Sequence, residues 1–82
     1  MYAISFTSVA EKQFLKLPKE TQARVKAALE RARIRPEAHF ERLVGMQTYK
    51  LRVGDYRIIA DIQHGNLVIL IIEVGHRRNI YK

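Results

Sequence analysis

The chain has 82 residues and no cysteine, 48% of its residues are hydrophobic, and fifteen Lys and Arg against eight Asp and Glu give a formal net charge of +7. That length fits one domain, residues 1–82, with a single thin core, and the lack of cysteine excludes a disulfide framework and thiolate metal sites. The positive charge favours a polyanionic partner, and nucleic acid is favoured over a membrane because no stretch approaches the roughly 20 apolar residues that span a bilayer.

The N-terminal segment predicts a strand that leads directly into a helix. Alternation in "YAISF" favours a strand over residues 2–6. Ser8 followed by Glu11 has the spacing of a capping box, with Ser8 as the N-cap. We therefore expect a helix of about ten residues that ends before Pro18.

A second helix is predicted from about Lys19, and Pro36 ends its pattern. Its apolar residues recur at helical spacing, which indicates a buried stripe made of Val25, Ala28, Leu29 and Ala32. The other face is basic, and a solvated helix surface is the favoured interpretation. Residues 37–47 show no clean period and are expected to form a connecting loop.

The second half of the chain has the pattern of strands. Residues 49–53 and 56–63 alternate on either side of Gly54-Asp55, and a two-residue loop with glycine first fits a type II′ hairpin turn. "QHGN" predicts a second hairpin turn. The segment "LVILII", residues 67–72, is apolar at every position and predicts a central strand buried on both faces.

The order of these elements is strand, helix, helix, strand, strand, strand. It predicts an α+β domain in which an N-terminal helical hairpin packs on one face of a mainly antiparallel four-stranded sheet. There are no further strand–helix units, so a doubly wound parallel sheet is excluded.

Cations gather on one face of this predicted sheet. The two-residue turn sets Arg52 directly opposite Arg57, and like charges at that spacing repel unless an anion such as a phosphate lies between them. Lys50 shares their face. The segment "VGHRRNIYK" then adds His76, Arg77, Arg78, Tyr81 and Lys82. Because an antiparallel strand returns to the turn end of the hairpin before it, we expect these groups to converge.

The chemistry that such a cluster supports is metal-free cleavage of RNA. His39, His64 and His76 lack metal-ligand spacing, and there is no glycine-rich phosphate loop. Attack of a 2′-OH on the adjacent phosphate needs neither metal nor cofactor, only orientation, charge stabilisation and proton transfer. Arginine forks match the phosphorane oxygens, while Lys50 and Tyr81 can exchange protons. Both groups start from a pKa of about 10, so the enzyme is expected to be slow without a partner that arranges its substrate.

Two long segments carry a family resemblance. "LVGMQTYKLRVGDYRIIADI" and "ILIIEVGHRRNIYK" resemble the hairpin and the C-terminal ending of the RelE/ParE toxin superfamily, and within it the RelE-type mRNA interferases. With the helical hairpin, the resemblance covers nearly the whole chain. It implies the toxin of a type II toxin–antitoxin system, a ribosome-dependent endoribonuclease that cuts mRNA in the decoding site. It also implies inhibition by a cognate, RelB-like antitoxin. The N-terminal segment "MYAISFTSVAEKQF" has no basic lead and no long apolar core, so it lacks the pattern of a secretory signal, and we expect a cytoplasmic location and no membrane association.

Carried over by position, the resemblance also implies roles for individual residues. The catalytic positions are Lys50, Arg52, Arg57, Arg77 and Tyr81, and we assign RNA contacts to His76, Arg78 and Lys82. Arg57 and Arg77 would bind the scissile phosphate, Lys50 would activate the 2′-OH or support the charge, and Tyr81 would orient the ribose or act as the base. Arg52 occupies a position where RelE-type enzymes have Lys, and arginine is a poor proton donor.

Three alternatives stay open. A ParE-type poison of DNA gyrase would cut no RNA, although relatives of that kind often lack the arginine and tyrosine of the ending. A catalytically inactive RNA- or antitoxin-binding module is favoured by Arg52. Finally, Arg57 can pair with Glu73, which a three-residue second turn would place across from it.

Overall fold

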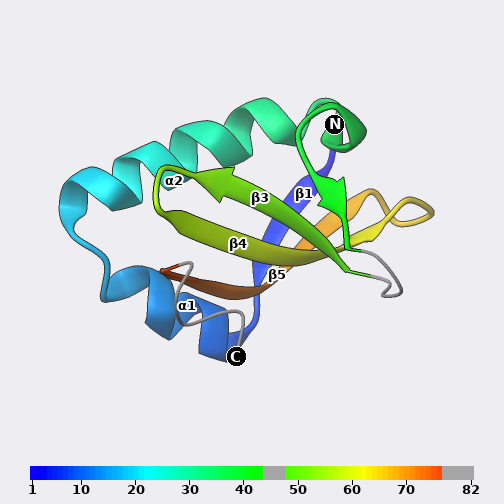
Figure 1. The fold of residues 1–82 in the computed structure, drawn as a ribbon. Helices are drawn as coiled ribbons and strands as arrows, with labels where there is room; N and C mark the ends of the chain where they lie inside the picture. Colours follow the sequence, from blue (N-terminus) through cyan, green and yellow to red (C-terminus); the bar gives the residue numbers. More distant parts are fainter. Residues whose placement is uncertain (44–47, 77–82) are drawn as a thin grey trace.

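The computed structural model describes residues 1–43 and 48–76, which form a sheet and two α-helices (Figure 1). The elements in chain order are β1 (Ala3–Phe6), α1 (Ser8–Leu15), α2 (Lys19–Ala32), the 3-10 turn η1 (Pro36–Ala38), β2 (Glu41–Arg42), β3 (Tyr49–Val53), β4 (Tyr56–Gln63) and β5 (Val68–His76). No helix in these two ranges is both long enough and apolar enough to cross a bilayer.

The sheet has five strands in the order β1-β5-β4-β3-β2. β1 pairs with β5 in parallel and the other neighbours are antiparallel, so the sheet is mixed. The predicted α+β class is confirmed, but the predicted four strands are wrong. The additional strand is β2, which has two residues inside the segment that we expected to be a loop. Two residues are too few to produce a period in the sequence.

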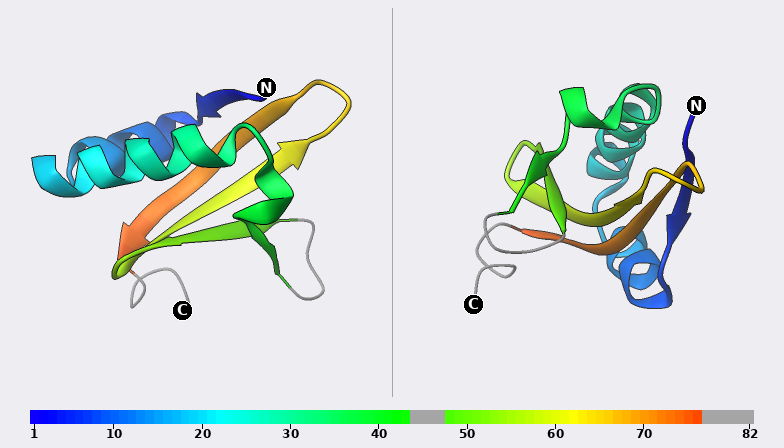
Figure 2. Two further views of the ribbon diagram at one scale, coloured as in Figure 1. Left: turned by 90° about the horizontal axis from the view of Figure 1, so that it is seen from above. Right: turned by 90° about the vertical axis from the view of Figure 1, so that its right-hand side faces the viewer.

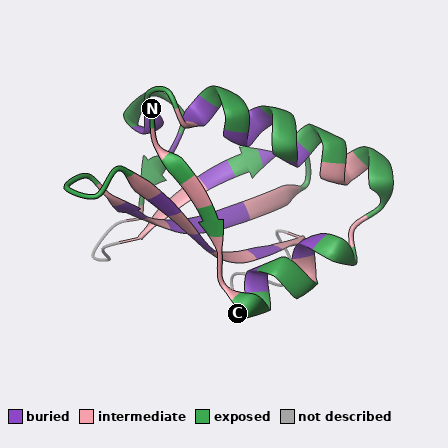
Figure 3. Cartoon of the chain, turned by 180° about the vertical axis from the view of Figure 1, so that it is seen from behind, coloured by how far each residue is buried: buried purple, intermediate pink, exposed green. Residues whose placement is uncertain are grey.

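Both helices cover the same face of the sheet (Figure 2). The predicted stripe of α2 is confirmed, because all four of its residues are buried. They share one core with Ala10 and Phe14 of α1 and with one face of strands β3 to β5. The outward surfaces of both helices are exposed (Figure 3). We call the sheet face opposite the helices the outer face.

The N-cap of α1 lies one residue before the predicted one. Thr7 is the N-cap, with φ −69° and ψ 163°, and its Oγ1 accepts the Ala10 N–H at 3.1 Å. The Thr7 N–H still donates to Ile71 O at 3.0 Å. Thr7 is therefore both the last residue held by the sheet and the cap, and Ser8 is the first residue of a helix of 8 residues.

The hairpin between β3 and β4 matches its prediction. Gly54 has φ +59°, and no described non-glycine residue in this turn has a positive φ, as a type II′ turn requires. The register sets Val53 opposite Tyr56 and Arg52 opposite Arg57, as predicted.

The last strand differs from its prediction. β5 lies between β1 and β4, and Ile69, Ile71 and Val74 are buried on its helix side. On the outer face Val68 and Leu70 are only partly buried, so burial on both faces is wrong. The turn before β5 spans residues 64–67, and a bulge follows in the ladder, where Ile59 faces Glu73 but Ala60 faces Ile71.

Candidate functional site

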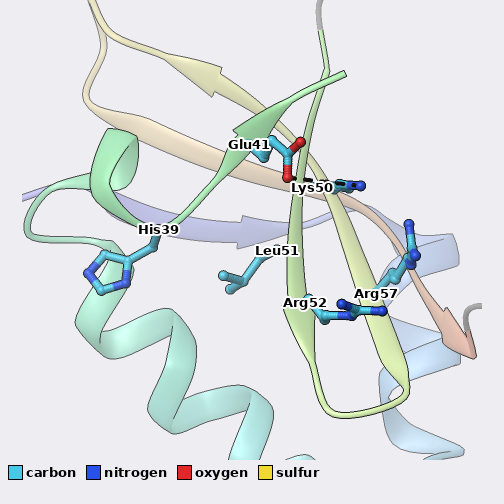
Figure 4. A pocket seen from close by; sticks show the side chains of 6 residues that line it. All are labelled: His39, Glu41, Lys50, Leu51, Arg52 and Arg57. Carbon is cyan, nitrogen blue, oxygen red and sulfur yellow. Dashed lines mark ion pairs between the residues drawn. The ribbon is translucent and has the colours of Figure 1, made fainter. Parts of the chain in front are cut away.

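Three cations project from the outer face of the β3–β4 hairpin (Figure 4). Leu51 and Val53 are buried against the helices, and side chains alternate along a strand, so Lys50 and Arg52 point to the outer face. Arg57 lies directly opposite Arg52. These three predicted site residues are therefore brought together by two adjacent strands.

The cations line a cavity of about 210 Å³, which we call the cationic pocket. Its lining residues are His39, Glu41, Lys50, Leu51, Arg52 and Arg57 (Figure 4). The pocket lies where β2 ends, because β2 pairs with β3 only at Glu41–Lys50 and Arg42–Tyr49. It therefore combines the cationic outer face with the edge of β3.

The pocket has a positive balance, with three cations and one carboxylate. Glu41 Oε2 lies 4.0 Å from Lys50 Nζ, and the side chains are 75% and 25% exposed. An ion pair this long and this exposed contributes little stability. Lys50 and Arg57 are half-buried on strands, which limits their motion. Such a pocket suits an anionic group, because charge-assisted bonds from guanidinium and ammonium groups hold phosphate oxygens.

Arg57 does not have the cross-strand neighbour that we considered. Gly75 lies opposite Arg57, and Glu73 lies opposite Ile59. The direct pairing of Arg57 with Glu73 is therefore wrong in register, because the second turn has four residues and the bulge between Ile59 and Ala60 shifts the ladder by one more. The same register confirms that the end of β5 returns to the Gly54 turn.

Of the other predicted site residues, His76 alone belongs to the part of the chain that the structure describes, and it does not line the pocket. His76 faces Tyr56, with ring centroids 5.6 Å apart in an edge-to-face arrangement. Both residues lie on the helix side of the sheet by alternation, away from the three cations. Arg77, Arg78, Tyr81 and Lys82 lie outside the described residues.

Sequence reasoning missed two residues of the pocket, His39 and Glu41. Both belong to the segment that we expected to be a loop. His39 follows η1, and Glu41 begins β2. Such short elements leave no periodic signal, so only the tertiary pairing with β3 reveals these residues. Among the described residues, no group of three His, Cys, Asp or Glu side chains could hold a metal ion.

Fold and pocket together define a small basic α+β protein with a cation-lined pocket on the outer face of its sheet. Residues 4–81 match the model of the ParE toxin of the type II toxin–antitoxin system parDE. The chain therefore belongs to the RelE/ParE superfamily of type II toxin–antitoxin toxins. A comparison with curated protein sequences gives no match.

Solved structures of RelE toxins and their complexes have the same fold. The intact E. coli RelBE toxin–antitoxin complex contains a chain 30% identical over 93% of this chain and 96% of that one, with a TM-score of 0.80. A chain of the RelBE2 complex from Mycobacterium tuberculosis is 28% identical over 93% of this chain and 98% of that one, with a TM-score of 0.81. The isolated E. coli RelE toxin is 27% identical over 93% of this chain and 84% of that one, with a TM-score of 0.82.

Proposed function

We propose that this chain is a ribosome-dependent endoribonuclease that cleaves mRNA by attack of a 2′-OH on the adjacent phosphate. The observation that carries the proposal is the convergence of Lys50, Arg52 and Arg57 on one pocket of the outer face. The likeness to RelE structures supports it. We assign this activity to a single toxin domain over residues 1–82.

The proposed reaction divides binding and proton transfer between these residues. Arg57 and Arg52 hold the non-bridging oxygens, where negative charge grows as the phosphorane forms. The 2′ oxygen forms a bond to phosphorus while the bond to the 5′ oxygen breaks, which leaves a cyclic phosphate and a 5′-OH. Lys50 takes part in proton exchange at the attacking oxygen. By the family resemblance, Arg77 adds to phosphate binding and Tyr81 orients the ribose or acts as the base.

Arg52 limits this chemistry. Its guanidinium stabilises negative charge, but arginine does not give up its proton in proteins, so Arg52 is a poor source of the proton that the 5′ oxygen needs. That proton has to come from Lys50, Tyr81 or water. We therefore expect cleavage to depend strongly on how the ribosome arranges the mRNA.

An antitoxin is the proposed protein partner. Several matched structures are RelB–RelE complexes, including the archaeal one from Pyrococcus horikoshii. We propose a cytoplasmic, RelB-like antitoxin whose acidic amphipathic helix covers the outer face of β5. There the partly buried apolar residues are Val68, Leu70 and Ile72. A net charge of +7 favours an acidic partner.

The test is to add the toxin to ribosomes translating a defined mRNA and to map the new 5′ ends. We expect cuts between the second and third bases of the codon in the decoding site, and none with Arg57→Ala. Absence of cuts with the wild-type chain would contradict the proposal. The matched family model is that of a ParE toxin, so gyrase poisoning is the second candidate. Supercoiling defects without RNA cuts would favour it.

A further inference from the structure

The ladder between β2 and β3 stops at Lys50, two residues before Arg52. Glu41 faces Lys50, so a continued antiparallel ladder would set His39 opposite Arg52. Instead, the His39 and Phe40 N–H groups donate to Pro36 O at 3.0 and 2.8 Å. Phe40 is buried, so the chain turns away from β3 at this point. A gap therefore opens between η1 and the edge of β3.

The main chain of Arg52 faces this gap. Backbone groups alternate between the two edges of an antiparallel strand. Val53 and Tyr56 flank the two-residue turn and bond to each other, and Leu51 pairs with Ile58 in the same way. The N–H and C=O of Arg52 consequently point to the opposite edge, where no described strand pairs with them. The Arg52 N–H can thus donate a hydrogen bond to a ligand in the gap, and the Arg52 C=O can accept one.

The remaining walls of the gap have the chemistry of a nucleobase site. His39 is exposed and carries an imidazole ring, and Glu41 supplies carboxylate acceptors. Unpaired RNA bases bind proteins by stacking on aromatic or histidine rings and by hydrogen bonds along their edges. At about 210 Å³ the cavity is smaller than the roughly 300–1,000 Å³ of drug-sized sites. It is therefore suited to one nucleotide.

We propose that this edge of the cationic pocket binds one nucleobase of the RNA next to the phosphate held by Arg57. The inference rests on the proposed function, because it assumes an RNA strand in the pocket. His39 stacks on the base, while Glu41 and the Arg52 main chain contact its edge. At the 4-position of a pyrimidine, the Glu41 carboxylate accepts a hydrogen bond from the amino group of cytosine but repels the O4 carbonyl of uracil, so cytosine is preferred over uracil. His39 and Glu41 are thus specificity-determining residues of this toxin.

The direct test is NMR titration of the labelled toxin with CMP, UMP and ribose 5-phosphate. We expect all three to shift the amide signals of Lys50 and Arg57, both nucleotides to shift that of His39, and CMP alone to shift that of Glu41 strongly. CMP should bind at least about fivefold more tightly than ribose 5-phosphate, the low end of what base stacking contributes. His39→Ala should abolish that difference. Glu37→Ala, an exposed neighbour that does not line the pocket, should retain it.

A second readout is the distribution of cut sites on ribosomes programmed with randomised codons. His39→Ala and Glu41→Gln should flatten the base preference next to the cut, whereas Glu37→Ala should not. If the wild type cuts mRNA but both variants keep its preference and CMP binds no better than ribose 5-phosphate, the base site is overturned and the nuclease stands. If CMP is preferred but no mRNA is cut, the base site stands and the nuclease is overturned.

Discussion

Arg52 and Arg57 lie directly opposite each other on β3 and β4, on the outer face of the sheet. Two like charges in a cross-strand pair destabilise the sheet. The strands are fixed by a tight turn and by buried neighbours on the helix side, so the charges cannot separate by a shift of register. An anion between them removes the repulsion, and a phosphate in RNA is such an anion.

Removal of Arg57 is expected to abolish cleavage without unfolding the chain. Arg57→Ala removes a donor aimed at the charge that develops on the phosphorane, an effect of about 10²–10³ in rate for comparable sites. Single-turnover cleavage on programmed ribosomes measures the loss, and circular dichroism verifies the fold. Arg31→Ala, which removes an exposed cation of α2, is the charge-matched control and should keep full activity. Equal activity of the two variants would contradict the proposed role of Arg57.

Inorganic phosphate is expected to stabilise the free toxin. A ligand that binds only the folded state raises stability by RT ln(1 + [L]/Kd), so the melting temperature should rise with phosphate concentration. The rise should disappear in the double variant Arg52→Ala/Arg57→Ala. Chloride at the same ionic strength controls for screening. An identical phosphate response in the double variant would show that the anion binds elsewhere.

Substitution of Arg52 by lysine is expected to increase the cleavage rate. A lysine can donate a proton to the leaving 5′ oxygen, and a well-placed general acid contributes about 10²–10⁴-fold. Arg52→Lys should therefore be faster than the wild type, and Arg52→Gln slower than both, in single-turnover assays. If lysine and glutamine reduce the rate equally, the bidentate geometry of arginine matters more than proton donation.

The N-cap of α1 can be tested with two neighbouring variants. Thr7→Ala removes the oxygen that accepts the Ala10 N–H and should cost about 1 kcal/mol, or roughly 4–8 °C in Tm for a domain of this size. Ser8→Ala, at an exposed first helical position, should change Tm little. Thermal denaturation compares them. A larger loss of Tm for Ser8→Ala than for Thr7→Ala would indicate that Ser8 is the N-cap.

Leu67 is expected to be strained. It is the only described non-glycine residue with a left-handed φ, at 55°, and its side chain is 48% exposed. A left-handed conformation costs an L-residue roughly 1–2 kcal/mol, and glycine avoids that cost. Leu67→Gly should therefore raise Tm, whereas Leu67→Ala, which keeps its Cβ, should not. A lower Tm for the glycine variant would mean that the Leu67 side chain contributes more than the strain costs.

The sequence by itself determined those elements that depend only on residues close together in the chain. The stripe of α2 repeats at helical spacing, and the Gly54 turn fixes its own register because only two residues connect the strands. The turn placed Arg52 opposite Arg57, and the alternation of side chains along a strand put Lys50 on the same face. The net charge of +7, which the sequence alone gives, likewise indicated a polyanionic partner.

Only the tertiary structure decided the rest. β1 runs parallel to β5, a pairing between residues more than sixty positions apart in the chain. β2 exists because two residues meet β3, and His39 reaches the pocket because Phe40 is drawn into the core. These features are stabilised by contacts between segments that are far apart in the chain, so the pattern of a short stretch of sequence does not predict them. The edge of the pocket, and with it the proposed choice of base, therefore follows from packing rather than from pattern.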